Sequence, residues 1–479
     1  MGRCKRPTFL RTDAGNAEMF AYESKDDLRY DHSRKRWFVW GGHWWIEDKD
    51  GLVYRRALSI ARMRGQGLPG ARDDEEREEE RKWAFQSESR ARLDAMVKLA
   101  ESHHLLTDAG DGWDSDPMLL GVANGVIDLT TGALRDGRQA DRITLHMDLN
   151  FDPGAKSPRW EQFLREVFRG DEALIGFVQQ AVGYNLTGLT SEQCLFLCYG
   201  TGANGKSTFL EVLRHIWGGY GYNLPFSAFE LKARSAISND IAAIAGKRLV
   251  TALETNESVQ LNEARIKALT GCDPITARYL YREYAVFPPT AKLWLAFNHL
   301  PDAADDSHGF WRRIRLIPFE QQFSGEQADK DLLAKLKAEA PGILNWALKG
   351  LRMYQQTGLS APPAVVAASD AYRQESDRLE YFFDEQCEIA ASAQIAAGVL
   401  WTDYLLWARD HEEGRPLSRK AFSGRLAAKG FRKVRRGHDG TWTWLGICLR
   451  RSDGGQQHPP GVAPRPADGC GRENPIVVS

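Results

Sequence analysis

The sequence predicts an α/β fold flanked by a smaller domain on each side, and three observations support this class. Between about residues 190 and 320, short apolar strand patterns alternate with helical patterns, as in a parallel sheet covered by helices. A glycine-rich turn joins one of these strands to the helix after it. Residues 26–187 mix strand and helix patterns, and residues 415–451 are basic and read as a helix followed by a hairpin.

The length of 479 residues exceeds what one hydrophobic core usually organises, so several domains are expected. We predict a loose N-terminus (1–25), an α+β domain (26–187), a P-loop nucleotide-binding domain (188–360), a C-terminal DNA-binding domain (361–451) and a disordered tail (452–479). The seven cysteines form no Cys-x-x-Cys pair, which argues against a zinc ribbon or a disulfide framework. No apolar run reaches membrane-spanning length, so we predict a cytoplasmic protein with no membrane partner.

Within the N-terminal domain, residues 28–54 predict two or three short strands, and the helical patterns follow at 72–107 and 159–187. Four tryptophans gather in the strand region: Trp37, Trp40, Trp44 and Trp45. Such a cluster could stack on nucleic-acid bases, but tryptophans in a small β unit more often form its core. We therefore favour a structural role for them. Residues 368–410 are predicted to be helical.

The glycine-rich turn has the residues of a phosphate-binding loop. It reads Gly200-Thr201-Gly202-Ala203-Asn204-Gly205-Lys206-Ser207, follows the apolar run 193–199 and leads into a helical pattern from Thr208. Glycines let backbone N–H groups face phosphate oxygens at a helix N-terminus. We expect residues 200–208 to bind ATP, with Lys206 reaching the β- and γ-phosphates and the Ser207 hydroxyl binding Mg²⁺.

Two further predicted strands end on polar residues. Residues 247–254 end on Glu254, with Glu257 three residues later, and residues 291–298 end on Asn298. A carboxylate beside the phosphate loop can hold Mg²⁺ or polarise the attacking water, and an amide can orient that water without adding charge. A polar residue at the end of a strand is common, so the assignment depends on the order of the three strands.

Three arginines follow in the segment Gly309-Phe-Trp-Arg312-Arg313-Ile-Arg315. An arginine that stabilises transition-state charge can be supplied by a neighbouring subunit. We expect Arg312 or Arg313 to have this role, and the residues alone do not choose between them. Ordinary ion pairing is an equally good interpretation of each arginine taken singly.

The strand–loop–helix, LETNE (253–257), KLWLAFN (292–298) and GFWRRIRLIPF (309–319), in this order, resemble superfamily 3 helicases. More closely, they resemble the phage/plasmid primase-helicase family, which is related to the poxvirus primase-helicase. ANGVIDLTTG (123–132) is similar to the pre-helicase domain of that family, EAPGILNWALKGL (339–351) to the segment after its motor, and YRQESD (372–377) to the junction with its C-terminal domain. The resemblance covers roughly residues 18–450.

The resemblance implies an AAA+-like motor that assembles as a hexameric ring and pulls single-stranded DNA through its centre. It would be an ATP-dependent replicative helicase of a phage, prophage or plasmid, acting on forked DNA. By position, Lys206 and Ser207 match Walker A, Glu254 matches the Walker B acid with Glu257 as its companion, Asn298 matches sensor 1, and Arg312 or Arg313 matches the arginine finger.

The segment 267–282 resembles the family motif that leads into a DNA-touching hairpin, with Lys267, Arg278 and Arg282 as its cations. Cys272 stands where a second glycine is usual. Bifunctional members of the family carry a primase domain upstream, and here the similar region begins near residue 20. We therefore expect no primer synthesis by this chain, and a separate primase or polymerase as a partner.

Residues 415–451 hold eleven lysines and arginines and one acid, Asp439, which indicates a polyanion-binding surface. A helix over 418–429 and a hairpin over 431–445 predict a winged helix. The expected DNA contacts are Arg419, Lys420 and Arg425 on the recognition helix and Arg432, Arg435 and Arg436 on the wing. A solvated surface or a subunit contact is the alternative.

Two other functions fit the same residues. One is a different DNA-dependent P-loop motor, which would show DNA-stimulated ATPase activity without strand separation. The other is an ATP-gated, origin-binding initiator, which would bind specific duplex DNA without turnover. The ordered motifs and the basic C-terminal segment favour the helicase.

Overall fold

The protein forms two compact units, residues 1–376 and residues 377–479. The computed structural model describes residues 7–66, 74–231, 239–254, 260–278, 284–301, 308–324, 329–376, 378–411, 416–436 and 440–450. The predicted tail (452–479) lies outside the described residues. The C-terminal unit begins sixteen residues after the predicted boundary at 361, since α13 (Pro363–Glu375) belongs to the first unit. Tyr372 of α13 donates its hydroxyl hydrogen to the carbonyl of Pro301, which ties this helix to the first unit.

A five-stranded sheet in which every pairing is parallel forms the centre of the first unit, in the order β14-β8-β13-β10-β9. Its strands are β8 (Leu195–Tyr199), β9 (Gly221–Asn223), β10 (Leu249–Leu253), β13 (Lys292–Phe297) and β14 (Ile314–Pro318). The apolar runs predicted from the sequence as strands correspond to β8, β10, β13 and β14, whereas the short β9 was not predicted. They are continuous rather than alternating because helices cover both faces of the sheet.

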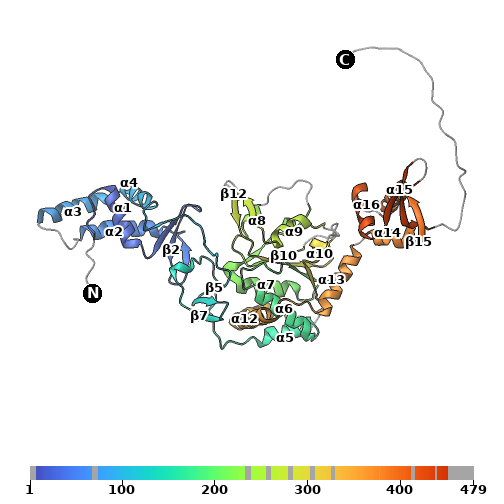
Figure 1. The fold of residues 1–479 in the computed structure, drawn as a ribbon. Helices are drawn as coiled ribbons and strands as arrows, with labels where there is room; N and C mark the ends of the chain where they lie inside the picture. The colour runs from blue at the N-terminus through green and yellow to red at the C-terminus, as the bar shows by residue number, and fades with distance from the viewer. Residues whose placement is uncertain are drawn as a thin grey trace, which may run out of the picture. The chain divides into compact units, whose positions relative to one another are not determined.

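Successive side chains of each strand enter two different cores. Phe196 of β8 and Trp294 of β13 point to one face, whereas Leu197 and Leu295 point to the other. On the first face lie α5 (Pro158–Val167), α6 (Glu172–Tyr184), α7 (Lys206–Trp217), α11 (Leu332–Ala338) and α12 (Ala340–Thr357). Figure 1 shows these helices on the side of the sheet away from α8 (Asn239–Ala242) and α9 (Glu263–Thr270).

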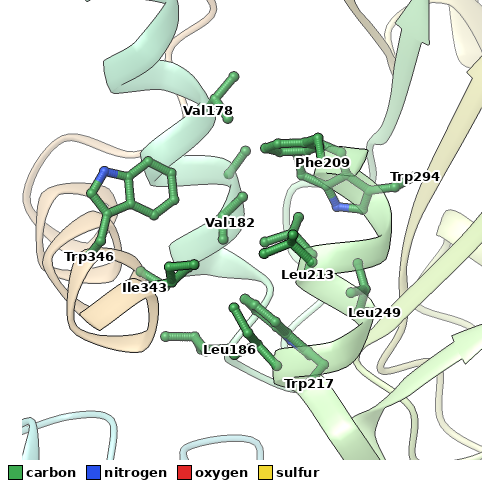
Figure 2. Packing of buried hydrophobic residues seen from close by; sticks show 14 of the residues in the cluster. Val178, Val182, Leu186, Phe209, Leu213, Trp217, Leu249, Trp294, Ile343 and Trp346 are labelled. Carbon is green, nitrogen blue, oxygen red and sulfur yellow. The ribbon is translucent and has the colours of Figure 1, made fainter. Parts of the chain in front are cut away.

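Packing between α6, α7 and α12 fixes the helix that follows the phosphate loop. In Figure 2, Phe209, Leu213 and Trp217 of α7 face Val178 and Val182 of α6 and Ile343 and Trp346 of α12. Burial of a side chain of this size contributes about 2–3 kcal/mol. The hydrophobic cluster runs from Leu120 to Val365, so it is continuous across the boundary predicted at residues 187 and 188.

The N-terminal region combines four helices with a small sheet of order β3-β2-β1-β4. Its elements are α1 (Asp13–Ser24), β1 (Leu28–Asp31), β2 (Arg36–Trp40), β3 (Trp45–Glu47), α2 (Leu52–Gly65), α3 (Asp74–Ser87), α4 (Arg90–Ala100) and β4 (Thr107–Asp108). The prediction of a loose N-terminus is wrong for α1, whose Phe20 and Ala21 are fully buried. The fully buried Arg64 also donates to the carbonyl of Phe9.

The tryptophans of this region are structural, as predicted. Trp45 is buried with Phe38 and Trp113, and Trp40 packs against this cluster. Trp37 packs against the core formed by α1, α2 and α4. A second small sheet, β5 (Leu119–Val122), β6 (Gly125–Asp128) and β7 (Ala133–Arg135), lies between this region and the parallel sheet in the sequence.

The described residues of the C-terminal unit form three helices and a three-stranded antiparallel sheet of order β15-β17-β16. Its elements are α14 (Arg378–Gln386), β15 (Cys387–Ala396), α15 (Ala397–Asp410), α16 (Arg419–Ala428), β16 (Arg432–Arg436) and β17 (Thr441–Leu449). The predicted helix–hairpin pattern is confirmed. The prediction that 368–410 is helical throughout is wrong over β15, because this alanine-rich segment pairs with β17.

Short elements complete the first unit. They are β11 (Ile275–Arg278), β12 (Tyr284–Phe287) and α10 (His308–Trp311), with single 3₁₀ turns at Gln139–Asp141, Gly218–Tyr220 and Phe226–Ala228. β11 and β12 form an antiparallel hairpin. No helix among the described ranges has both the length and the apolar character needed to cross a membrane.

Candidate active site

The glycine-rich loop connects β8 directly to α7, as its sequence predicted. Gly202 and Gly205 have φ values of 105° and 85°, which disfavour any side chain. A Cβ atom on Gly200 would lie 2.0 Å from Nδ2 of Asn204 and 2.3 Å from the carbonyl oxygen of Phe319. The loop is therefore shaped by glycine at each of these three positions, and its last glycine immediately precedes the N-terminus of α7.

Lys206 begins α7 and turns its amine back into the loop. Its Nζ donates to Oδ1 of Asn204 at 2.8 Å and to Oδ1 of Asn298 at 3.2 Å, and it also donates to the carbonyl of Gly200. The side chain is 5% exposed, and burial lowers the pKa of the amine. Its hydrogen-bond partners are neutral oxygens, and it forms no ion pair with an acid among the described residues. A buried amine with this environment favours an incoming anion.

Glu254 and Asn298 meet because β10 and β13 are adjacent and parallel, with Leu253 beside Ala296 in the register. Oε2 of Glu254 accepts the backbone N–H of Asn298 at 3.1 Å and that of His299 at 3.4 Å. The carboxyl ends of parallel strands are where ligands bind in open α/β sheets. Lys206, Glu254 and Asn298 thus converge at this edge, which we call the carboxyl edge.

The segment after β14 contacts the loop from its other side, and no motif in the sequence predicted this contact. Asn204 Nδ2 donates to the carbonyl of Phe319 at 2.9 Å, and the N–H of Phe323 donates to the carbonyl of Ala203 at 2.8 Å. Nε2 of Gln322 donates to the Thr201 hydroxyl oxygen at 2.8 Å. Because β14 pairs with β8 in parallel, both strands end at the same edge of the sheet. A prediction of this pairing would have indicated the contact.

Ser207 lies exposed in the first turn of α7, next to Lys206, and Thr208 follows it. Within the described residues, no three His, Cys, Asp or Glu side chains gather into a metal cluster. Mg²⁺ commonly uses one or two protein oxygens together with water and phosphate, so a hydroxyl and one carboxylate suit it. Glu257 lies outside the described residues.

The structure does not bring Arg312 and Arg313 to Lys206. Both precede β14, and the N–H of Leu195 at the start of β8 donates to the carbonyl of Arg313. The arginines therefore lie at the opposite edge of the sheet, the amino edge, with the whole of β8 between them and the loop. A five-residue strand spans about 13 Å from its first to its last Cα.

The two arginines have different surroundings. Arg313 donates through Nε to the Thr270 hydroxyl oxygen at 3.1 Å and through Nη1 to the carbonyl of Gly309. Arg312 is exposed and donates through Nη2 to Oε1 of Gln193, a residue held at a φ of 46°. Gln193 was not predicted to have a role.

Two buried cations, also not predicted, occupy the amino edge farther along the sheet. Lys292 donates to the carbonyls of Thr187, Leu189 and Thr290, and burial lowers its pKa well below the ordinary value. Arg248 donates to the carbonyls of Leu186, Asp116 and Leu119. These cations bind the chain just after the C-terminus of α6, where carbonyls lack helical partners.

The residues predicted to bind DNA fall in two places. Lys267 lies in α9 and Arg278 ends β11, whereas Arg282 lies outside the described residues. Arg419, Lys420 and Arg425 lie in α16, and Arg432, Arg435 and Arg436 lie in β16. Arg419 and Lys420 are exposed, as are the three arginines of β16. DNA binding by these residues stays a prediction.

Two segments of the first unit match known protein families. Residues 17–169 match the family described as "D5 N terminal like", and residues 198–313 match a family described as being of unknown function. "Putative helicase L207/L206" of Acanthamoeba polyphaga mimivirus is 29% identical over 296 residues, covering 57% of this chain and 31% of that protein. This chain is related to the primase-helicase family.

Further relatives extend the similarity. "Putative helicase 022R" of Frog virus 3 is 23% identical over 501 residues, covering 78% of this chain and 51% of that protein. "Putative primase C962R" of African swine fever virus is 24% identical over 325 residues, covering 61% of this chain and 33% of that protein. The chain thus spans about a third to a half of the length of these relatives.

A solved structure supports the α/β fold class of this chain. The apo structure of the NrS-1 C-terminal region matches with a TM-score of 0.53 and 9% identity, covering 90% of this chain and 99% of that one. At this identity the match concerns the fold alone. Both chains therefore share a mixed α/β architecture.

Proposed function

We propose that this chain is an ATP-dependent DNA helicase with a P-loop, AAA+-like motor domain of superfamily 3. The observation that carries the proposal is the convergence of Lys206, Glu254 and Asn298 at the carboxyl edge, beside the glycine-rich loop. The viral relatives named as helicases support a role in replication. In this proposal the energy for strand separation comes from ATP bound at that edge.

Each residue at the carboxyl edge has a distinct part in the proposed reaction. The loop N–H groups and Lys206 bind the β- and γ-phosphates, and Lys206 exchanges its internal oxygen partners for phosphate oxygens. Glu254 polarises the attacking water, and Asn298 orients it while its own backbone fixes the Glu254 carboxylate. Mg²⁺, when bound by Ser207 and by Glu254 through water, would neutralise phosphate charge.

We propose that a neighbouring subunit supplies the missing arginine. Arg312 is exposed and its guanidinium donates to the side chain of Gln193, whereas the less exposed Arg313 donates to both Thr270 and Gly309 of its own chain. Arg312 is therefore the better candidate for the arginine finger. A site that requires a residue from the next copy favours a closed ring, and a hexamer is the form we propose.

We propose that the C-terminal unit is a winged helix that binds DNA. Its order α14-β15-α15-α16-β16-β17 places a basic helix directly before a basic hairpin, as in winged helix-turn-helix proteins. Arg419 and Lys420 would face phosphates or base edges from α16, and Arg435 and Arg436 would do so from the hairpin.

A variant of the phosphate-loop lysine tests the proposal. We expect Lys206→Ala to abolish both ATP hydrolysis and unwinding of forked DNA, because the β- and γ-phosphates lose their cation while the packing of α7 remains. The measurements are phosphate release and strand displacement, with circular dichroism as the check on folding. Lys349→Ala, an exposed lysine of α12, serves as the matched control and should behave like the wild type.

The outcomes of this experiment separate the candidate functions. Unwinding that survives Lys206→Ala contradicts the proposal. Wild-type protein that hydrolyses ATP in response to DNA without displacing a strand would be a different P-loop motor. Sequence-specific duplex binding without any ATP turnover would indicate an origin-binding initiator, which the basic C-terminal unit would also serve.

A further inference from the structure

The β16–β17 hairpin carries a tryptophan that the core of its unit does not use. Trp442 and Trp444 lie two residues apart on β17 and so point to the same face of the sheet. Trp444 is 2% exposed and packs in the core, whereas Trp442 is 47% exposed. The strand thus supplies one tryptophan to the core and leaves the other on the surface, beside the turn of the hairpin.

Two cations from β16 flank the exposed ring. Nζ of Lys433 lies 5.5 Å and Cζ of Arg435 lies 5.3 Å from the centroid of Trp442, and Arg435 is its direct partner in the register. Arg432 and Arg436 are exposed on the same strand. The ion pairs among described residues of this unit are Arg409–Asp410, His411–Glu385 and Lys429–Glu380, so none neutralises β16.

Single exposed apolar side chains are common and need no function. The unit has others, such as Tyr381 on α14 and Ile389 on β15. Tyr381 is 50% exposed, but within the described part of the chain no cation lies over its ring. What distinguishes Trp442 is the combination of an open aromatic ring with unneutralised cations on an adjacent strand.

We propose that Trp442 stacks on an unpaired base of single-stranded DNA while Lys433 and Arg435 contact the neighbouring phosphates. An aromatic ring beside backbone-neutralising cations is the arrangement that holds single strands without regard to sequence. Duplex bases are already stacked on one another, so the ring has no partner within an intact duplex. The inference rests on the proposed function, because an unwinding enzyme produces the single strand that this hairpin would hold.

Full-length variants test this inference by fluorescence anisotropy with labelled oligo-dT and with a duplex of equal length, without nucleotide. Trp442→Ala should raise the Kd for oligo-dT by about 5- to 150-fold and change the Kd for duplex far less. Trp442→Phe should retain most of the affinity, because it keeps a ring. The control Tyr381→Ala, which removes an equally exposed aromatic side chain from the same unit, should bind like the wild type.

Salt dependence separates stacking from charge. Arg435→Ala should reduce the slope of log Kd against log salt by about one for oligo-dT, whereas Trp442→Ala should leave this slope unchanged. The inference is overturned if Trp442→Ala binds oligo-dT like the wild type, or weakens single-strand and duplex binding equally without rescue by phenylalanine.

The two proposals fail in different ways. Wild-type unwinding together with unchanged oligo-dT binding by Trp442→Ala would remove the stacking role and leave the helicase standing. Trp442-dependent binding by a protein that hydrolyses no ATP would remove the helicase and leave the stacking site standing. Wild-type protein that binds no oligo-dT would overturn the stacking site directly, whatever its ATPase activity.

Discussion

The two edges of the parallel sheet differ in how their polar side chains are used. At the carboxyl edge, Lys206, Glu254 and Asn298 bind one another through hydrogen bonds and face the open loop. At the amino edge, Lys292 and Arg248 are buried, donate to backbone carbonyls and lie over the rings of Tyr184 and Tyr220 respectively. The same strands therefore present the candidate active site at one end and buried cations bound to backbone carbonyls at the other.

Arg312 and Arg313 were predicted from the sequence to be catalytic. They lie far from the phosphate loop because they precede β14 and therefore stand at the amino edge. They occupy the exposed part of the amino edge, next to the start of β8. In the proposed ring, Arg312 at the amino edge of one copy would meet the carboxyl edge of the next copy. Among the residues of the amino edge, Arg312 is therefore the one whose change should have the largest effect on ATP hydrolysis.

Arg312→Ala should lower kcat for ATP hydrolysis by about a thousandfold, since an arginine finger contributes 10³ to 10⁵. Arg313→Ala should lower it by less than about tenfold, because its guanidinium binds Thr270 and Gly309 within its own chain. Steady-state ATPase assays at saturating ATP measure both. A larger loss for Arg313→Ala would show that the two arginines have been assigned the wrong way round.

Lys292→Ala should lower the free energy of unfolding by about 3 kcal/mol, because the buried carbonyl of Thr187 and the partly buried carbonyls of Leu189 and Thr290 would lose their donor. Urea titration followed by tryptophan fluorescence measures this effect, with Lys349→Ala again as the control. A change of less than about 0.5 kcal/mol would mean that the buried cation is not an anchor, since ordinary surface substitutions have effects of that size.

Local patterns predicted the central strands and the phosphate loop, because apolar runs, glycines and a lysine at fixed spacing act through neighbouring residues. They failed where distant pairing decides the structure. β15 is rich in alanine and reads as helix, yet it pairs with β17. Helix α2 was missed although its buried residues, Val53, Ala57, Ile60, Ala61 and Arg64, follow a helical stripe.

The residues of the candidate site could be predicted where they stand at the ends of predicted strands. Parallel strands that end on Glu254 and Asn298 place these residues beside the loop, and the structure shows them there. The positions of Gln193, Arg248 and Lys292 were not predictable, because their partners lie far away in the sequence. Arg248 and Lys292 donate to distant backbone carbonyls, and Gln193 accepts from the guanidinium of Arg312. Which arginine is exposed also depends on Thr270, in a different helix.

Mixing two inactive variants tests the central claim that the site is completed by a neighbouring subunit. Arg312→Ala retains the carboxyl edge and lacks the arginine, whereas Lys206→Ala retains the arginine and lacks the lysine. We predict that each is inactive alone and that DNA-stimulated ATP hydrolysis reappears after the two are mixed and reassembled. A mixture that stays inactive although mixed assemblies form, or an Arg312→Ala protein as active as the wild type, would contradict the account.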